Sequence, residues 1–487
     1  MIPPRYVVPV VAALLATACT VGPDYVRPAV DAPPAWRVSY PEAADVANVR
    51  WWERFDDPVL PSLIDKALVN NLDLEIAAAR VDAFIGQLDT TRAQLYPQLG
   101  YSFSAARSRA SVSGPSGTIP GDPYSTLYQG ALGADWQLDL FGRVQRQTEE
   151  ARARVYATEQ GRRGVVLTVV TSVANAYITL RGLDAQLDIA RNTAKNYADT
   201  LVIFEKRHKG GVVSNFELTQ VRSQYQQASA AIPALLQQIA EQENLISVLL
   251  GQNPAPIPRG KTIDALATPG IPADLPSSLL LRRPDILAAE QNLVAANASI
   301  GAAKALYFPQ ISLTGSLGAA SAAFGNFLAG PAATWSVAAG LVGPLFNAGS
   351  IAGQVRTSEA ATAEALANYR QTVLIAFRET SDALAGTVNK RDEAAAQAGR
   401  VISLREYARL ARRRFDAGYS GYLEVIYAEN ELFTAELEAV ASNTATFTRV
   451  VDVYKAVGGG WVDIADQSTA AGSKTPATER AAKQPLF

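Results

Sequence analysis

The spacing of apolar residues changes twice along this chain, each time at a proline. Upstream of Pro97 the apolar positions recur every three or four residues, whereas in "PQLGYSFSA" they alternate with small or polar ones. The same change occurs in "ALYFPQISLTGS" at Pro309, 212 residues later. Proline lacks an N–H and restricts the residue before it. We therefore expect a helix to end and a strand to begin at Pro97 and at Pro309.

The elements around these prolines follow one repeated order. In the first half we expect helices over residues 58–96, 142–208 and 215–250, with strands after Pro97 and over 128–140. In the second half we expect helices over 285–307 and 351–415, a return helix ending at Val457, and strands over 311–317 and 334–342. The helix breaks "RHKGGVVSNFEL" at Gly211 and "RFDAGYSGYLEV" at Gly418 align at an offset of 207 residues. The chain is therefore an internal duplication.

Length and composition shifts divide the chain further. At 487 residues it exceeds the usual single-core size of about 250–300 residues, so several domains or an elongated architecture are expected. The predicted segments are a signal peptide (1–18), an N-terminal tether (19–57), the first repeat (58–251), a proline-rich linker (252–284), the second repeat (285–461) and a disordered tail (462–487).

The expected strands have two unlike faces. In the second strand Leu132, Ala134 and Trp136 alternate with Gly133, Asp135 and Gln137. Strands of about 10 residues with one apolar face are typical of transmembrane β-strands. A soluble four-stranded sheet covered by helices is the alternative, although the alternation is cleaner than such a sheet requires.

Four strands cannot close a barrel within one chain, because the smallest barrels have about eight. An open edge is not tolerated in lipid, where its backbone groups find no partner. The chain should therefore oligomerise: two copies would give 8 strands, and three copies 12, with a wider lumen. Gln129, Asp135, Gln137 and Asp139 would face the water inside. The charged long helices must lie outside the membrane, where they should form a helical tube.

The N-terminus has the pattern of a secretory signal, with Arg5 followed by an apolar run and small residues up to Cys19. "LATAC" resembles a lipobox, in which Cys19 becomes the acylated first residue of the mature protein. The alternative is that Cys19 is discarded with the signal. Downstream of Ala18 no run reaches the roughly 18 apolar residues of a transmembrane helix.

Composition excludes several function classes. A net charge of −2 gives no basic surface for nucleic acid. The presence of only one Cys and one His argues against a protein-built metal site. No nucleophile–base set or phosphate loop is present, so we expect neither an enzyme nor a bound cofactor.

Several motifs together resemble the outer membrane factors of tripartite efflux pumps. They are "CTVGPDYVRPAVDAPPAW", "WWERFDDPVLPSLIDKALVNNLDLEIAAARV", "LLLRRPDILAAEQNLVAANASIGAAKALYFPQISLTG", "GPLFNAGSIAG" and "YKAVGGGW". The chain is most similar to the lipoprotein, NodT-type branch of these TolC-like channels, which includes OprM. The resemblance implies a homotrimer with a 12-stranded transmembrane β-barrel, an α-helical periplasmic barrel and a lipid anchor in the outer membrane. It also implies a periplasmic adaptor and an inner-membrane transporter of the resistance-nodulation-division type as partners.

The resemblance further implies a gate at the periplasmic tip, around the turns at Gly211 and Gly418. By motif, the residues matching tip or gate positions are Phe415, Tyr419, Leu423, Glu424, Tyr427 and Glu217. Tyr427 stands where many members have a gate Asp, and Asn430 where the OprM-like pattern has Arg. We therefore expect ion pairs to contribute less to holding the gate closed in this chain, and bulky aromatic side chains to close it instead. The alternative for each residue is ordinary packing at a helix hairpin.

The leading functional hypothesis is a passive export duct for drugs or other small molecules. A type I secretion exit channel on the same fold and a lipid-anchored helical scaffold without a pore remain as alternatives. The sequence does not identify the exported substrate.

We expect the mature protein to begin at an acylated Cys19, because this lone cysteine follows "LLATA". Mass spectrometry of the purified protein should find the N-terminal peptide carrying the lipid. An unmodified N-terminus at another residue would contradict the lipobox.

Overall fold

The computed structural model describes residues 20–30, 32–33, 49–111, 123–271, 279–458 and 461–469. Cys19 and the expected signal peptide lie outside the described residues. The helices and strands are η2 (Trp51–Phe55), α2 (Val59–Asn70), α3 (Leu72–Ala93), β1 (Gln98–Arg109), β2 (Tyr124–Leu138), α4 (Arg143–Lys209), α5 (Asn215–Leu249), η3 (Ile263–Ala265), α6 (Leu279–Arg282), α7 (Pro284–Lys304), η5 (Ala305–Tyr307), β3 (Gln310–Ser321), η6 (Phe324–Asn326), η7 (Gly330–Ala332), β4 (Ala333–Val342), α8 (Ser350–Asp416), α9 (Tyr422–Val457) and α10 (Trp461–Gln467).

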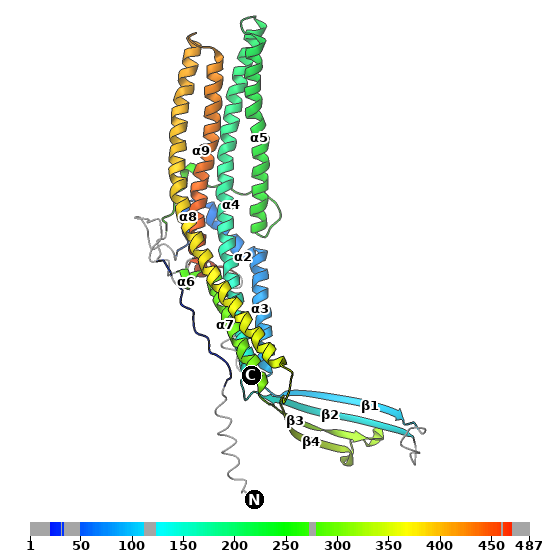
Figure 1. Cartoon of the computed structure of the whole chain (residues 1–487). Helices are drawn as coiled ribbons and strands as arrows, with labels where there is room; N and C mark the ends of the chain where they lie inside the picture. The colour runs from blue at the N-terminus through cyan, green and yellow to red at the C-terminus, as the bar shows by residue number, and fades with distance from the viewer. Residues whose placement is uncertain are drawn as a thin grey trace. The chain divides into compact units, whose positions relative to one another are not determined.

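The chain folds into two compact units, each assembled from segments far apart in sequence (Figure 1). The sheet unit comprises the described parts of Met1–Ala29, Asp82–Ala157 and Ala289–Tyr369. The hairpin unit comprises the described parts of Val30–Val81, Thr158–Ala288 and Arg370–Phe487. Both units contain segments from each repeat, so each unit is assembled from both halves of the duplicated sequence.

The sheet has the order β1-β2-β3-β4 with every neighbouring pair antiparallel. Its register places Tyr101, Leu132, Leu317 and Trp335 in one row across the four strands. The next row along the strands contains Gly100, Gly133, Ser316 and Ser336, and the two serine hydroxyls are 2.8 Å apart. Since side chains alternate between faces along a strand, these rows lie on opposite faces. The four strands therefore share one apolar face and one small or polar face.

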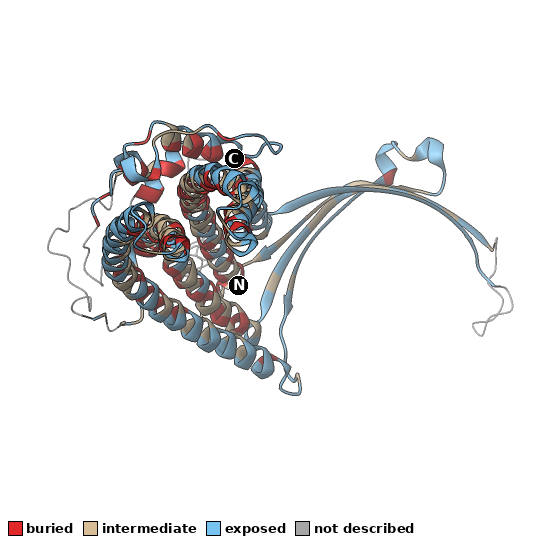
Figure 2. Ribbon diagram, turned by 90° about the horizontal axis from the view of Figure 1, so that it is seen from above, coloured by how far each residue is buried: buried red, intermediate tan, exposed pale blue. Residues whose placement is uncertain are grey.

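The apolar face is open in this chain. Tyr101 is 89% exposed, Leu132 64% and Trp335 77%, and the curved sheet is coloured mostly exposed or intermediate in Figure 2. Contiguous large apolar residues are rarely left in water by soluble monomers. The alternative of a soluble sheet covered by helices is wrong for this chain. The sheet instead has the sidedness of a membrane-spanning one.

Both prolines lie where the chain passes from helix to strand. α3 ends at Ala93 and β1 begins directly after Pro97, while η5 ends at Tyr307 and β3 begins directly after Pro309. The Trp136 indole N–H donates to the Leu95 carbonyl at 2.9 Å and so ties β2 to the first junction.

The single helix expected over 58–96 is wrong, because the chain turns at Asn71. This residue has extended backbone (ψ 127°) after α2. Its side-chain oxygen accepts hydrogen bonds from the backbone N–H groups of Asp73 and Leu74, which caps α3. Its side-chain nitrogen donates to the Leu249 carbonyl at 2.8 Å, which fixes the break against the end of α5.

The expected tether is also partly wrong. Trp51 and Trp52 in η2 are fully buried in the hairpin unit, where Trp51 stacks on Tyr454 with ring centroids 4.8 Å apart. Aromatic rings bury large areas, so they anchor this segment to the core. In the sheet unit, Thr20–Ala29 packs on α4 and α7, with Asp24 paired to Arg146 at 2.7 Å and Arg27 to Glu290 at 2.8 Å.

The tail and the linker contain further corrections. Residues Trp461–Gln467 form α10, so the disorder expected from residue 462 is wrong over 462–467, and Asp466 makes ion pairs with the buried Arg162 of α4. Such a pair is retained only where its geometry compensates desolvation. Residues 470–487 of the expected tail lie outside the described residues. In the linker, Ile257 and Ile263 are buried in the core of the hairpin unit, so this segment is part of the fold.

One helix among the described residues, α4, contains an 18-residue window apolar enough to cross a membrane. However, 56% of that window is buried inside the protein. Val166, Val170 and Val173 of α4 are fully buried in the main core. The apolar content of α4 is therefore that of a core helix.

The sidedness of the sheet can be tested with two charge substitutions on β2. Leu132→Arg places a cation on the apolar face and should destabilise the inserted barrel by about 2–4 kcal/mol per chain. Asp135→Arg, on the other face, should leave assembly intact. The readout is the amount of heat-resistant oligomer on native gels, and equal assembly of both variants would reverse the face assignment.

Candidate functional site

The two helical hairpins, α4–α5 and α8–α9, each end in a turn (Figure 1). The two turns have the same backbone hydrogen bonds. At the first turn the Val212 N–H donates to the Arg207 carbonyl at 2.9 Å, and at the second the Tyr419 N–H donates to the Arg414 carbonyl at 2.8 Å. Gly211 (φ 74°) and Gly418 (φ 76°) occupy the left-handed position that this helix ending requires. The duplication therefore extends to the geometry of the tips.

The helices that follow the turns are capped differently. Ser214 caps α5 through its hydroxyl, and the Glu217 carboxylate returns to the Ser214 N–H at 2.9 Å, which completes a capping box. At the equivalent position α9 begins after Gly421, which has no side chain to cap it. Glu424, the counterpart of Glu217, instead pairs with Arg414 at 3.2 Å. Two matched carboxylates thus have different partners at the two tips.

The second tip exposes three apolar residues, which we call the tip stripe: Tyr419, Leu423 and Tyr427. Leu423 and Tyr427 lie one turn apart on α9, and Tyr419 precedes them in the turn. Their exposed fractions are 80%, 60% and 60%. The same offset of 207 residues pairs Tyr419 with Val212 and Leu423 with Phe216, which are also exposed.

Phe415 differs from the other residues predicted for this site. It is half-buried and lies in the aromatic contact between the hairpins, with its ring centroid 5.0 Å from Tyr422 and 6.4 Å from Phe204. A small core surrounds these rings, including the buried residues Leu218 and Val425. Phe415 therefore packs the two tips together instead of facing outward with the tip stripe.

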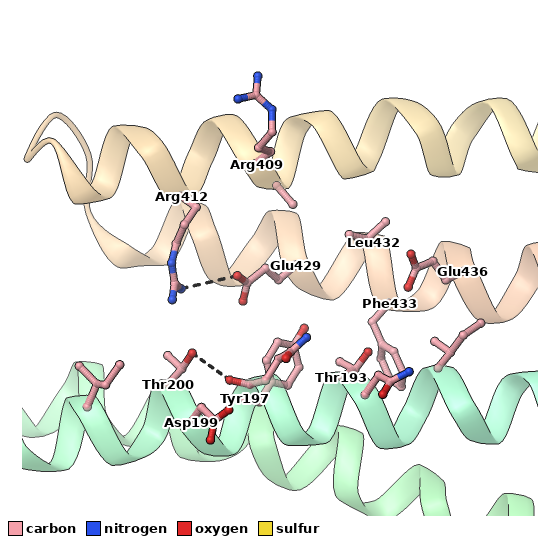
Figure 3. A pocket seen from close by; sticks show the side chains of 15 residues that line it. Thr193, Tyr197, Asp199, Thr200, Arg409, Arg412, Glu429, Leu432, Phe433 and Glu436 are labelled. Atoms are coloured by element: carbon pink, nitrogen blue, oxygen red, sulfur yellow. Dashed lines mark hydrogen bonds and ion pairs between the residues drawn. The ribbon is translucent and has the colours of Figure 1, made fainter.

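A cavity of about 740 Å³ lies between the hairpins near this core. Its lining comes from α4, α8 and α9 and includes Tyr197, Asp199, Arg409, Arg412, Glu429 and Glu436 (Figure 3). Glu429 accepts a hydrogen bond from the Gln224 amide of α5 at 3.3 Å and pairs with Arg412 of α8 at 3.6 Å. Arg412 also donates to the Tyr422 hydroxyl at 3.2 Å. This polar contact, like the core beside it, joins one hairpin to the other.

Comparison with known proteins places this arrangement in a family. The outer membrane efflux protein family matches residues 63–252 and 275–459. The toluene efflux pump outer membrane protein TtgC of Pseudomonas putida is 35% identical over 94% of this chain and 96% of its own length. The cation efflux system protein CusC of Escherichia coli is 34% identical over 94% of this chain and 99% of its own. The solved outer-membrane channel OprN superposes with a TM-score of 0.83 at 28% identity, over 91% of this chain and 100% of that one.

This chain belongs to the outer membrane efflux protein family. It is an outer membrane protein with the fold of these channels, and the family consists of transport channels rather than enzymes. Within that fold the sheet unit supplies the strands, and the hairpin unit supplies the paired helices whose tips carry the candidate site.

The contacts between the hairpins were missed in the sequence, although two signals were present. "SNFE" at 214–217 has the spacing of a capping box. Glu429 follows Val425 and Ile426 and precedes Phe433 at helical intervals, so it is a charged residue at a position where the helix is otherwise buried. Neither signal identifies the partner, because Gln224 and Glu429 are 205 residues apart.

The capping box can be tested in the full-length efflux protein. Ser214→Ala removes the hydroxyl that caps α5 and should cost about 1 kcal/mol locally, speeding amide exchange in the first turn of α5 about fivefold. Ser214→Thr keeps the acceptor and serves as the control. Hydrogen-exchange mass spectrometry gives the readout, and unchanged exchange in the alanine variant would rule out a stabilising cap.

Proposed function

We propose that this protein is the outer membrane exit duct of a tripartite efflux pump, passively exporting drugs or other small molecules. The observation that carries the proposal is the four-stranded sheet with one apolar face and one polar face. Neither β1 nor β4 has a second partner strand among the described residues. Since lipid offers no hydrogen bonds to open edges, the edges are satisfied by further copies of this chain.

An assembly of three copies suits both the apolar face and the polar face of the sheet. Twelve strands enclose a lumen wider than the side chains fill, whereas eight would be nearly filled. The row of Gly100, Gly133, Ser316 and Ser336 then lines that lumen with small groups. The helical hairpins continue the duct in the periplasm, where an adaptor protein joins them to an inner-membrane transporter of the resistance-nodulation-division type.

An acyl chain on Cys19 anchors the chain beside the barrel. Thr20 lies next to Gly142, just after the end of β2, and the Val21 N–H donates to the Phe141 carbonyl at 3.3 Å. These contacts support a lipid held close to the junction of sheet and helices. The Asp24–Arg146 ion pair also holds this N-terminal segment against α4, independently of the lipid.

Similarity to relatives does not identify the molecule that this protein exports. Relatives of nearly equal identity carry names that refer to toluene and to cations. We therefore assign selection to the inner-membrane transporter and treat this chain as a common duct for small molecules.

At rest the duct is closed at the hairpin tips by the tip stripe. Three copies of Tyr419, Leu423 and Tyr427 form an apolar constriction that excludes water by dewetting. Tyr427 cannot form the ion pair that an Asp at this position would form, so closure depends on apolar packing. Arg414 neutralises Glu424 beside the constriction, which limits repulsion between the three carboxylates.

The gate assignment can be tested by conductance. Tyr419→Ser combined with Leu423→Ser should raise single-channel conductance in planar bilayers and increase vancomycin entry into cells. Tyr427→Ala alone should give a smaller increase.

The matched control is Val212→Ser combined with Phe216→Ser, which removes the equivalent exposed residues of the first tip. This control should leave conductance unchanged. If the two double variants behave alike while trimers stay intact, the tip stripe is not the gate. If neither wild-type trimers nor trimers of the Tyr419→Ser and Leu423→Ser double variant conduct, the duct itself is refuted.

A further inference from the structure

Glu429 occupies an unusual place for a charged residue. Its side chain is only 24% exposed and lies among four helices, between the aromatic core of the tips and the 740 Å³ cavity. Its neighbours along α9, Val425 and Phe433, are buried. A carboxylate in such a place loses hydration that few groups replace.

The contacts of Glu429 span both hairpins. Gln224, which is 3% exposed, reaches it from α5 of the first hairpin, and Arg412 reaches it from α8 of the second. Both contacts are long for charge-assisted bonds, at 3.3 and 3.6 Å, whereas good ones are about 2.7–2.9 Å. The Arg412 guanidinium is shared with Tyr422, whose hydroxyl it contacts at 3.2 Å and whose ring centroid lies 5.7 Å away. The carboxylate is therefore incompletely compensated.

The other charged and titratable groups around the cavity do not improve this balance. From α8, Arg409 is paired with Glu406, and from α9, Glu436 is paired with Arg405 at 2.7 Å. From α4, Asp199 adds another carboxylate and Tyr197 a phenol. Burial raises the pKa of Tyr197 and raises that of Tyr422 to about 12, so both phenols stay neutral near pH 7.

We propose that Glu429 is a pH-dependent latch between the hairpins, loosening their packing while it is ionised and tightening it when it takes up a proton. The inference rests on the proposed function, because it assumes that the tips open and close. A neutral carboxyl keeps its hydrogen bond to Gln224 as a donor to the amide oxygen after an amide flip, and it no longer carries a charge that needs hydration. The closed tip then packs against its core without that penalty.

The direction of the pH dependence follows from the linkage between proton binding by Glu429 and closure of the tip. Burial raises the pKa of the Glu429 carboxyl, while Arg412 and Gln224 oppose the rise only in part. In an open tip, where water reaches the carboxyl, the pKa falls back toward its ordinary value. The closed tip therefore binds the proton more tightly and gains stability as the pH falls through the raised pKa. The gain is complete below the ordinary carboxyl value, and each pKa unit between the two states shifts the closed-to-open ratio about tenfold.

The test measures conductance of reconstituted wild-type trimers between about pH 7.5 and about pH 4.5. The open fraction should fall as the pH is lowered. Glu429→Gln, which is neutral throughout, should hold the open fraction at its low-pH level at every pH. Glu431→Gln, on the same helix but with a side chain that is 41% exposed and paired with Arg400, should retain the wild-type response.

A second readout does not depend on the pore. Amide exchange in residues 204–224 and 408–430 should slow on acidification, after correction for the intrinsic pH dependence of exchange, in the wild type and not in Glu429→Gln. The latch is refuted if Glu429→Gln keeps the wild-type pH response in conducting trimers, or if it opens the channel. If no variant conducts at any pH, the proposed duct fails, and the exchange data alone then decide whether Glu429 couples the hairpins.

Discussion

Lipid supplies no hydrogen bonds to a polypeptide backbone, and the structure of this protein depends on that constraint. The sheet pairs β2 and β3 on both sides, and the outer edges of β1 and β4 have no partner strand among the described residues. At both changes from helix to strand a proline, which lacks an N–H and so cannot continue the helix, stands directly before the strand. The apolar character of lipid is a second constraint, and it accounts for the uniform sidedness of the strands: every row of the register must be either apolar or compatible with water across all four.

Duplication supplied two matched halves, and small differences between them separate their roles. The turns at Gly211 and Gly418 are superimposable in their hydrogen bonds, yet Ser214 caps one following helix and Gly421 leaves the other uncapped. Where the serine hydroxyl is present, Glu217 takes part in the cap of its own helix, and where it is absent, Glu424 pairs with Arg414 across the turn. The first tip has a capped helix and exposes Val212 and Phe216, whereas the second has an uncapped helix and exposes the tip stripe, and the two share one small core.

The segments outside the repeats, together with the last residue of the second repeat, contribute to the core of the hairpin unit. Trp51 and Trp52 come from the expected tether, Ile257 and Ile263 from the linker, and Trp461 from the chain after α9, yet all five are buried in one cluster. Arg162 of α4 holds α10 through Asp466. The membrane-facing apolar surface is left open while the core of the hairpin unit is densely closed, so stability and insertion are carried by different residues.

The sequence by itself determined the order of the four strands and of the long helices, the duplication, the sidedness of the strands and the position of both tips, because these follow from local periodicity and from glycine and proline. It also carried enough motifs to indicate the family. Only the tertiary structure decided which of these elements contact one another. The break at Asn71 depends on the end of α5. The folding of residues 461–467 into α10 depends on the ion pair with Arg162. Phe415 points inward because its ring packs against Phe204 and Tyr422. Glu429 was visible as a charge at a buried position, but its meaning depends on Gln224, 205 residues away. Contacts at such separations are set by how whole helices pack, and no local pattern records that packing.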